Sequence, residues 1–309
     1  MLSPEFVEVA KRVSNWGRWG DDDELGTLNL IDAAAVQRGA ACVRTGKRFS
    51  LAVRLDQRSP QVGGIPGRIN PLRTMIAINT PYAGDVANFC CSDDIVTMGL
   101  QASTHWDSLA HVSYGGQLYN GYPAATVTAE AGATKLGMHK VRSLTSRGVL
   151  LDVARAKGVG QLEPGYGITA ADLTDALELA DVVLESGDVV LVRTGRAQLL
   201  RAGDRVEYTT GAQAGLGIEC PEWFHGHDVA AVATDTVAME QYPCADPAAL
   251  FPVHLLQLRD MGLTQGQNFD LEDLADDCAA DGRYAFLLEA SPIPFTGALG
   301  SPVNPVALK

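Results

Sequence analysis

The residues best suited to chemistry are two histidines and an aspartate within segment 101–111. His105 and Asp107 are two residues apart, so an extended segment places both side chains on the same face. An imidazole nitrogen and a carboxylate oxygen on one face supply part of a divalent-metal site. His111 follows four residues later, and a bend at residues 108–109 would return it to the same pocket. There it would move protons to and from a water activated by the metal.

The same spacing is also typical of a turn that contains a hydrogen-bonded histidine, so the flanking sequence decides between the two interpretations. The cluster follows an apolar, β-prone run at residues 95–100, Ile-Val-Thr-Met-Gly-Leu. Functional side chains are commonly placed where a regular element ends. This favours a metal site at the end of a strand. Trp106 alternates with the two candidate ligands, so we expect it to pack into the core on the other face.

The segment resembles the His-x-Gly-Thr-His-x-Asp-x-Pro-x-His signature of the cyclase family of metal-dependent hydrolases, which includes bacterial arylformamidases and isatin hydrolase. The residues that match are Thr104, His105, Asp107 and His111. Three positions depart from the signature at its first metal-binding histidine, its glycine and its proline, namely Gln101, Ser103 and Leu109. Further segments resemble the family in the same order along the chain, at residues 19–29, 187–195, 233–236 and 297–303.

The resemblance implies the remainder of the site. His254 is similar to a later histidine ligand of the family, and Gln267 is the best match to a Glu or Gln ligand that follows it. Thr104 would hydrogen-bond a ligand carboxylate, and Asp235 would give structural support near the site. The implied ligands are therefore His105, Asp107, His254 and Gln267, with Gln101 as an additional candidate and His111 as the catalytic acid and base.

Two imidazoles, one carboxylate and neutral amide oxygens suit Mn or Zn better than Ca, which prefers oxygen ligands alone. Gln101 and Gln267 are weaker donors than the His or Glu of other family members, so we expect one divalent metal per chain rather than two. The isatin hydrolase branch is similar, with a Gln at the Glu position and a single metal. The resemblance thus implies a hydrolase that acts on a cyclic amide, a lactone or an aryl formamide.

Two other functions remain open. The two glutamines would also fit a metal- or ligand-binding protein that has lost catalysis. A metal-dependent lyase or dehydratase would use the same site, with His111 abstracting a carbon-bound proton. The sequence has no Gly-x-Gly-x-x-Gly after a strand, no Gly-Lys-Ser/Thr and no Gly-x-Ser-x-Gly, which argues against a nucleotide-binding enzyme and a serine hydrolase.

The remaining histidines are weaker candidates. His225 and His227 have a His-x-His spacing, but they follow an expected short helix, where capping and surface roles are common. His139 stands alone and is expected to be a surface or core residue. Metal binding at residues 101–111 is therefore the preferred prediction.

The elements that would position the site indicate an α/β protein with a mixed sheet, because the strands do not alternate strictly with helices. Expected strands cover residues 48–55, 75–78, 94–100, 149–153, 189–192, 229–234 and 284–289. Expected helices cover residues 31–43, 169–179, 219–225, 252–261 and 270–280, and the second begins with a capping box. Residues 57–73 are expected to form a loop that covers the active site. The resemblance sharpens this to a swivelling β/β/α layered fold, a single domain over 1–309 with an N-terminal arm at 1–30.

Composition limits the partners and the location. Hydrophobic residues make up 46% of the 309 residues, enough for a sizeable core, and the formal net charge of −13 argues against nucleic acid and anionic membranes. No apolar run of about 18 residues and no signal-like N-terminus is present, so we expect a cytoplasmic protein. The six cysteines form no Cys-x-x-Cys pair and are expected to be reduced. Expected partners are a small-molecule substrate and, from the family, further copies in a homodimer or homotetramer.

Overall fold

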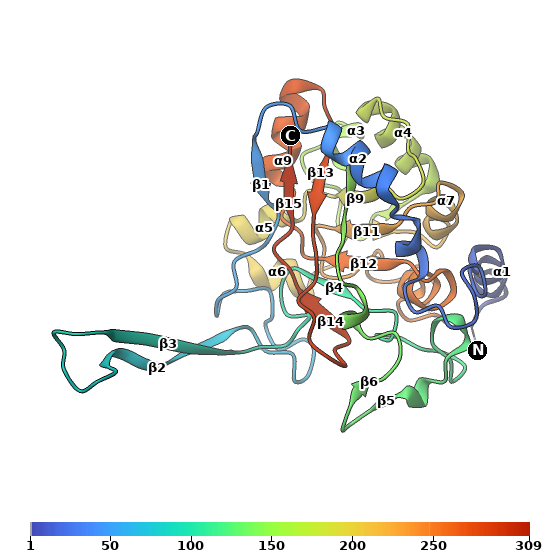
Figure 1. Ribbon diagram of the computed structural model, residues 1–309. Coiled ribbons are helices and arrows are strands. Elements are labelled where there is room, and N and C mark those ends of the chain that lie inside the picture. Colours follow the sequence, from blue (N-terminus) through green and yellow to red (C-terminus); the bar gives the residue numbers. More distant parts are fainter. Residues whose placement is uncertain (1, 247) are drawn as a thin grey trace.

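The centre of the fold is a mixed nine-stranded sheet in the order β1–β15–β13–β7–β9–β11–β12–β4–β14 (Figure 1). This computed structural model describes residues 2–246 and 248–309. The four central strands are parallel: β7 (Thr145–Asp152), β9 (Val189–Arg193), β11 (Ala231–Thr234) and β12 (Thr264–Gln267). The others join antiparallel: β1 (Arg48–Ser50), β4 (His105–Asp107), β13 (Ala285–Glu289), β14 (Gly300–Pro302) and β15 (Val306–Leu308). The predicted layered α/β fold with a mixed sheet is confirmed.

Helices cover both faces of this sheet, which explains why its parallel strands are apolar throughout. Alternate residues of β7 and β9 belong to two separate apolar clusters, one packed against α1, α4 and α7 and the other against α9. The helices are α1 (Pro4–Val13), α2 (Ala33–Ala41), α3 (Val153–Ala156), α4 (Ala170–Ala180), α5 (Ala197–Arg201), α6 (Arg205–Thr210), α7 (Cys220–Gly226), α8 (Pro252–His254) and α9 (Glu272–Asp281).

Helix starts follow the capping residues in the sequence. Thr169 accepts a hydrogen bond from the backbone of Asp172, whose carboxylate accepts one from the backbone of Thr169. This confirms the predicted capping box of α4.

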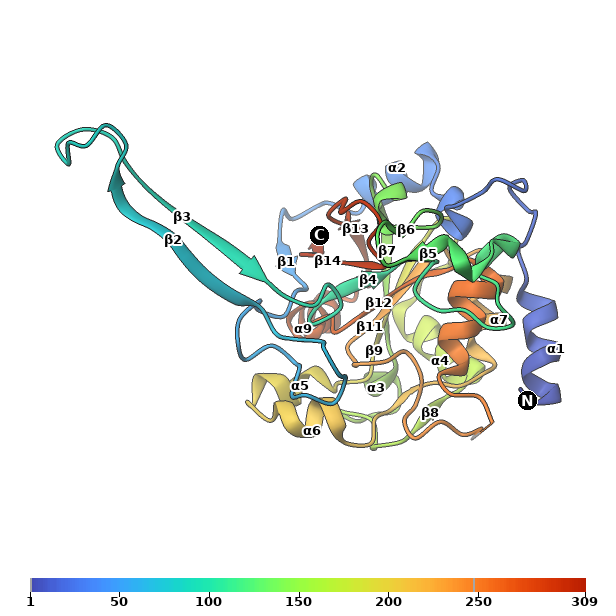
Figure 2. The same ribbon diagram turned by 90° about the horizontal axis from the view of Figure 1, so that it is seen from below.

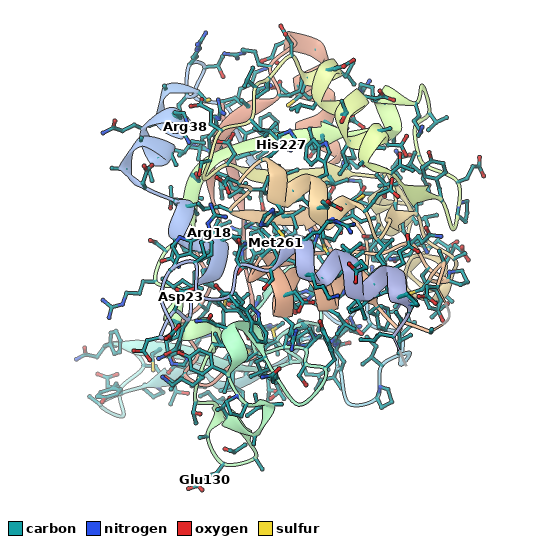
Figure 3. The ribbon with its side chains drawn as sticks, turned by 90° about the vertical axis from the view of Figure 1, so that its right-hand side faces the viewer. Arg18, Asp23, Arg38, Glu130, His227 and Met261 are labelled. Atoms are coloured by element: carbon teal, nitrogen blue, oxygen red, sulfur yellow. The ribbon has the colours of Figure 1, made fainter. Side chains whose placement is uncertain are left out.

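The chain also contains short 3₁₀ turns and short two-stranded ladders: η1 (Gly26–Leu30), η2 (Tyr119–Gly121), η3 (Ala124–Thr126), η4 (Met138–Lys140), β5 (Val127–Thr128), β6 (Gly132–Ala133), β8 (Gly167–Ile168) and β10 (Gly215–Leu216). Figure 3 shows Glu130 at the outer tip of the β5–β6 turn.

The segment predicted as one helix over 252–261 differs from that expectation. It begins as α8 and continues as the π-helical segment η5 (Leu255–Met261). Residues of the N-terminal arm bind its last carbonyls: Trp16 Nε1 donates to Arg259 O at 2.8 Å, and Asn15 Nδ2 donates to Met261 O at 2.9 Å. Helix α1 lies along the same face beside Met261 (Figure 3). The arm thus packs on its own chain and holds the helix that follows His254.

A long two-stranded hairpin projects from the body of the molecule (Figures 1 and 2). Its strands are β2 (Leu72–Pro81) and β3 (Cys90–Thr97), and they pair only with each other. The strands predicted at 75–78 and 94–100 lie in this hairpin, but their predicted bounds were wrong. No core covers the hairpin, so burial periodicity did not mark its ends. Before β2, the described chain from 56 to 71 is a loop, so the loop predicted over 57–73 ends two residues earlier than expected, where β2 begins. None of the described helices is long and apolar enough to cross a membrane.

Candidate metal centre

Strands β4 and β12 carry most of the predicted ligands. They pair antiparallel with Gln267 opposite His105 and Gln265 opposite Asp107. Residues directly opposite one another share a face of the sheet, so all four side chains point to the same side. The residue between the two ligands on β4, Trp106, is fully buried on the other face, as predicted.

Gly266 lets the two strands approach with this register. A Cβ at this position would lie 2.8 Å from the Trp106 ring and 2.7 Å from the Phe269 ring. The two rings pack edge to face with their centroids 5.2 Å apart, and Trp106 Nε1 donates to Ala290 O at 2.8 Å. The rings beneath β12 therefore fix the strand that presents Gln265 and Gln267.

The polar atoms of the cluster converge on the Asp107 carboxylate. His105 Nε2 lies 3.3 Å from Asp107 Oδ1, and His254 Nε2 lies 4.0 Å from Asp107 Oδ2. The amide of Gln267 reaches within 3.5 Å of His254 Nε2. His111 Nε2 lies 3.8 Å from Asp107 Oδ1, so the chain does return this histidine to the pocket. The structure thus brings together three histidines, one aspartate and one glutamine from distant parts of the chain.

Hydrogen bonds behind the imidazoles fix their orientation. His105 Nδ1 donates to Ser103 O at 2.7 Å. His254 Nδ1 donates to the Glu240 carboxylate at 2.7 and 2.9 Å, and Glu240 Oε1 also accepts from the backbone N–H of His254 at 2.6 Å. Each imidazole therefore carries its proton on Nδ1 and turns the lone pair of Nε2 to the centre. A carboxylate behind a histidine is a common feature of metal sites. Sequence reasoning did not find Glu240.

The cluster changes the acidity of its members. Burial opposes ionisation of Asp107, but the charges of His111, His105 and His254 hold the pKa of its carboxyl well below the usual range. Burial alone would lower the pKa of His254, yet the Glu240 carboxylate raises it above the ordinary value. Burial lowers the pKa of His111 despite the nearby Asp107. A charged carboxylate faced by the Nε2 atoms of two imidazoles is a donor arrangement that suits a divalent cation.

Two oxygen atoms of the cluster indicate what is to be bound. Asp107 Oδ1 and Gln267 Oε1 are buried, and neither makes a hydrogen bond within the described residues. Leaving buried acceptors unpaired is costly, and a cation would satisfy both. In a tetrahedral zinc site, ligand atoms at about 2.0–2.1 Å from the ion lie about 3.3 Å apart. The separation of His105 Nε2 and Asp107 Oδ1, 3.3 Å, fits this spacing.

Other distances in the cluster exceed that spacing. Across residues 2–246 and 248–309, no group of three or more His, Cys, Asp or Glu side chains is arranged closely enough to hold a metal ion. Here the separation of His254 and Asp107, 4.0 Å, would have to shorten by less than an ångström. Rotation about side-chain bonds supplies such a movement. The donor set therefore fits one divalent cation held by His105, Asp107, His254 and Gln267.

Of the two predicted supporting residues, Thr104 has a different partner from the one expected. The Thr104 hydroxyl donates to Asn268 O at 2.5 Å and accepts from the backbone N–H of Val53 at 2.8 Å. The expected bond to a ligand carboxylate is not formed, because alternation along the chain turns Thr104 away from Asp107. Thr104 instead connects the segment before β4 with the segment after β12.

Asp235 supports a neighbouring loop rather than the ligands. Its carboxylate accepts hydrogen bonds of 2.7–2.9 Å from the backbone and hydroxyl of Thr194 and from the backbone of Gly195. Burial raises the pKa of Asp235 to about 6, against the effect of these donors. The carboxylate thus holds the chain where β9 ends, next to the strands that carry the site.

Gln101 lies on the ligand face, beside Gly300. A Cβ on Gly300 would be 2.8 Å from Gln101 Nε2, and Gly300 is paired with Asp107. Within the described chain, no hydrogen bond joins Gln101 to the four ligands. Its role as an additional ligand stays a prediction.

The other histidines are held by local contacts. His225 Nε2 lies 3.2 Å from Asn15 Oδ1, while His227 donates to Trp223 O at 2.8 Å and stacks on the Trp223 ring. His139 Nδ1 accepts from the backbone of Gly297 at 3.1 Å. These contacts account for the histidines outside the cluster.

Comparison with known proteins identifies the family of this chain. The profile of the family described as putative cyclase matches residues 49–241, and the chain belongs to this cyclase family, as predicted. A crystal structure of "a novel cyclase" is 40% identical and covers 96% of this chain and 100% of its own, with a TM-score of 0.86. No curated protein matches the chain.

More distant solved structures share the fold. Isatin hydrolase A from Labrenzia aggregata, bound to benzyl benzoate, is 18% identical and covers 87% of this chain and 94% of its own, with a TM-score of 0.63. A predicted metal-dependent hydrolase from Bacillus stearothermophilus is 15% identical and covers 85% of this chain and 98% of its own, with a TM-score of 0.52.

Proposed function

We propose that this chain is a metal-dependent hydrolase that cleaves the C–N or C–O bond at the carbonyl of a cyclic amide, a lactone or an aryl formamide. The convergence of two imidazole nitrogens, a carboxylate and the Gln267 amide beside a further histidine carries this proposal. Family membership supports it, as do the names of two relatives of the same fold, an isatin hydrolase and a predicted metal-dependent hydrolase.

His105, Asp107, His254 and Gln267 would hold one Mn or Zn ion. When bound, such an ion polarises a substrate carbonyl and makes water more acidic. The contribution of the chain is to hold the donors ready, because the ligands on β4 and β12 are almost inaccessible to solvent. The bond from His254 to Glu240 keeps the imidazole in the required tautomer.

His111 would be the acid and base of the reaction. Its side chain is 22% exposed, whereas that of Asp107 is 1% exposed, so His111 lies next to a ligand and can still be reached from solvent. Its lowered pKa keeps the imidazole neutral near pH 7 and able to accept the proton of an attacking water at Nε2. Asp107 would stabilise the imidazolium until the proton passes to the leaving nitrogen or oxygen.

The test is an assay of the metal-loaded protein with formanilide, a lactone and isatin, read by the mass of the product. A ring-opened product heavier than the lactone or isatin by one water, or aniline and formate from formanilide, supports the proposal. A product formed by loss of water would instead indicate a dehydratase that uses the same site. Tight metal binding without a product from any of these compounds would favour the non-catalytic binding protein.

Association of identical copies is part of the same proposal. Ile76, Ile78 and Phe89 of the β2–β3 hairpin are 63%, 67% and 63% exposed. An isolated two-stranded hairpin is only marginally stable in water, and apolar exposed surface commonly marks association. A second copy of the chain in a homodimer or homotetramer would cover it.

The six free thiols agree with a cytoplasmic location, where cysteines stay reduced.

A further inference from the structure

Arg68 has an environment that no other arginine of the chain shares. The arginines that are at least partly buried make ion pairs or donate to carbonyl oxygens, as Arg193 and Arg196 do. Among the described residues, every other arginine whose side chain has no partner is exposed. Arg68 is half-buried and has neither an ion pair nor a side-chain hydrogen bond within the described chain. No nitrogen of the Arg68 guanidinium is fully buried, so the unpaired charge stays within reach of a ligand that enters from solvent.

The loop that carries Arg68 is fixed against the segment leading into β4. Gln61 Nε2 donates to Ala102 O at 2.9 Å. Asn70 Nδ2 donates to Gln61 O at 2.7 Å, and Asn70 Oδ1 accepts from the backbone of Gln61 at 3.0 Å. The backbone of Gly99 donates to Ile69 O at 3.0 Å. These bonds on both sides of Arg68 hold it beside residues 99–103, immediately before His105.

The side chain of Arg68 runs across Gly99. Its Cγ lies 3.1 Å from the position that a Cβ on Gly99 would occupy, so the absence of a side chain there leaves space for the arginine stem. Burial lowers the pKa of Arg68, and the Asp107 carboxylate offsets part of this effect. Burial lowers the pKa of His111, and the charge of Arg68 adds to that lowering. The guanidinium therefore acts electrostatically on the cluster while it is paired with none of its members.

We propose that Arg68 binds the substrate, and that the substrate carries a carboxylate in addition to the carbonyl that is hydrolysed. This inference rests on the proposed hydrolase function for the identity of the reaction. A guanidinium offers paired N–H groups that match the two oxygens of a carboxylate. The formal charge of the chain is −13, so an anionic substrate would need a local cation at the pocket. Arg68 would also select carboxylated substrates over neutral ones.

The experiment compares 4-formamidobenzoate with formanilide, which has the same formamide group but no carboxylate. Hydrolysis is measured with metal-loaded wild type, Arg68→Gln and the control Arg58→Gln. Arg58 is exposed on the same loop and its side chain has no described partner. A hydrogen bond to a charged group contributes about 1.5–3 kcal/mol. We therefore expect Arg68→Gln to lower kcat/KM for the anion by about 10- to 100-fold more than kcat/KM for formanilide. Arg58→Gln should match wild type.

Calorimetric titration of the same metal-loaded proteins with both compounds separates this inference from the proposed function. Binding of the anion that weakens only in Arg68→Gln supports Arg68 even if neither compound is hydrolysed. Equal effects of Arg68→Gln on the two compounds, or no effect on either, would overturn the assignment even if both are hydrolysed. Anion binding that is lost in His105→Ala but retained in Arg68→Gln would also overturn it, because the carboxylate would then bind at the ligand cluster.

Discussion

Replacement of Glu240 by glutamine tests how the second imidazole ligand is held. Glu240 is 1% exposed and accepts from both the backbone N–H and the Nδ1–H of His254. Glutamine has nearly the same volume but only one acceptor oxygen, so its NH₂ group would face one of these two donors. Water cannot replace the lost bond at a buried position. His254 would then lose both its fixed tautomer and the negative charge that makes Nε2 a better donor.

Loss of such a carboxylate costs about 10- to 100-fold in metal affinity, which corresponds to about 1.4–2.7 kcal/mol. We expect this loss in Glu240→Gln for Zn or Mn, measured by competition with a chromogenic chelator. Glu222→Gln is the control, since this glutamate is 45% exposed and pairs with Arg12 at the surface. Circular dichroism and thermal unfolding of the metal-free proteins should show that both variants are folded. A folded Glu240→Gln variant with wild-type metal affinity would refute the role of Glu240 and weaken the assignment of His254 as a ligand.

Three further variants test the catalytic, packing and association parts of the account. His111→Ala should retain its metal but lose about 10²- to 10⁴-fold in kcat, and full activity would refute its acid–base role. Gly266→Ala should destabilise the fold by about 1–3 kcal/mol in urea unfolding, because the new methyl meets two aromatic rings. The control Gly226→Ala has open space and should be nearly neutral. Ile78→Lys on the hairpin should reduce the mass measured by light scattering, unlike Val183→Lys on the body; an unchanged mass would contradict association through the hairpin.

Local patterns in the sequence predicted the core of the site. The two-residue spacing of His105 and Asp107 required only that the segment be extended, and β4 fulfils that condition. The same alternation placed Trp106 in the core. The position of His254 and Gln267 came from the family resemblance, because nothing local connects them with residues 105–111. Register between β12 and β4 then brings Gln267 to His105.

Glu240 and Arg68 escaped prediction because long-range contacts alone define their roles. Glu240 lies outside the helices and the nine-stranded sheet, and only the fold brings its carboxylate to His254. The one sequence feature that could have suggested Glu240 is that it is an acidic residue before a predicted histidine ligand. Arg68 lies in a loop whose path depends on hydrogen bonds from Gln61 and Asn70. The expectation that residues 57–73 would cover the active site pointed to this loop without identifying a residue in it.

Local sequence patterns also did not predict the length of the hairpin or the presence of the C-terminal strands. Strand β2 continues to Pro81 with mostly exposed side chains, so alternation between polar and apolar positions did not mark its length. Residues 300–308 follow the last predicted strand, yet they form β14 and β15 at positions determined by β4 and β13. Short strands of this kind are defined by their neighbours in the sheet rather than by their own sequence.

The metal content of the protein tests the central claim most directly. It is measured by inductively coupled plasma mass spectrometry on protein purified without a metal-affinity tag. We predict about one Mn or Zn per chain in the wild type and loss of this ion in His105→Ala. Absence of metal even after incubation with Mn or Zn, or retention of the ion in His105→Ala, would contradict the proposed centre.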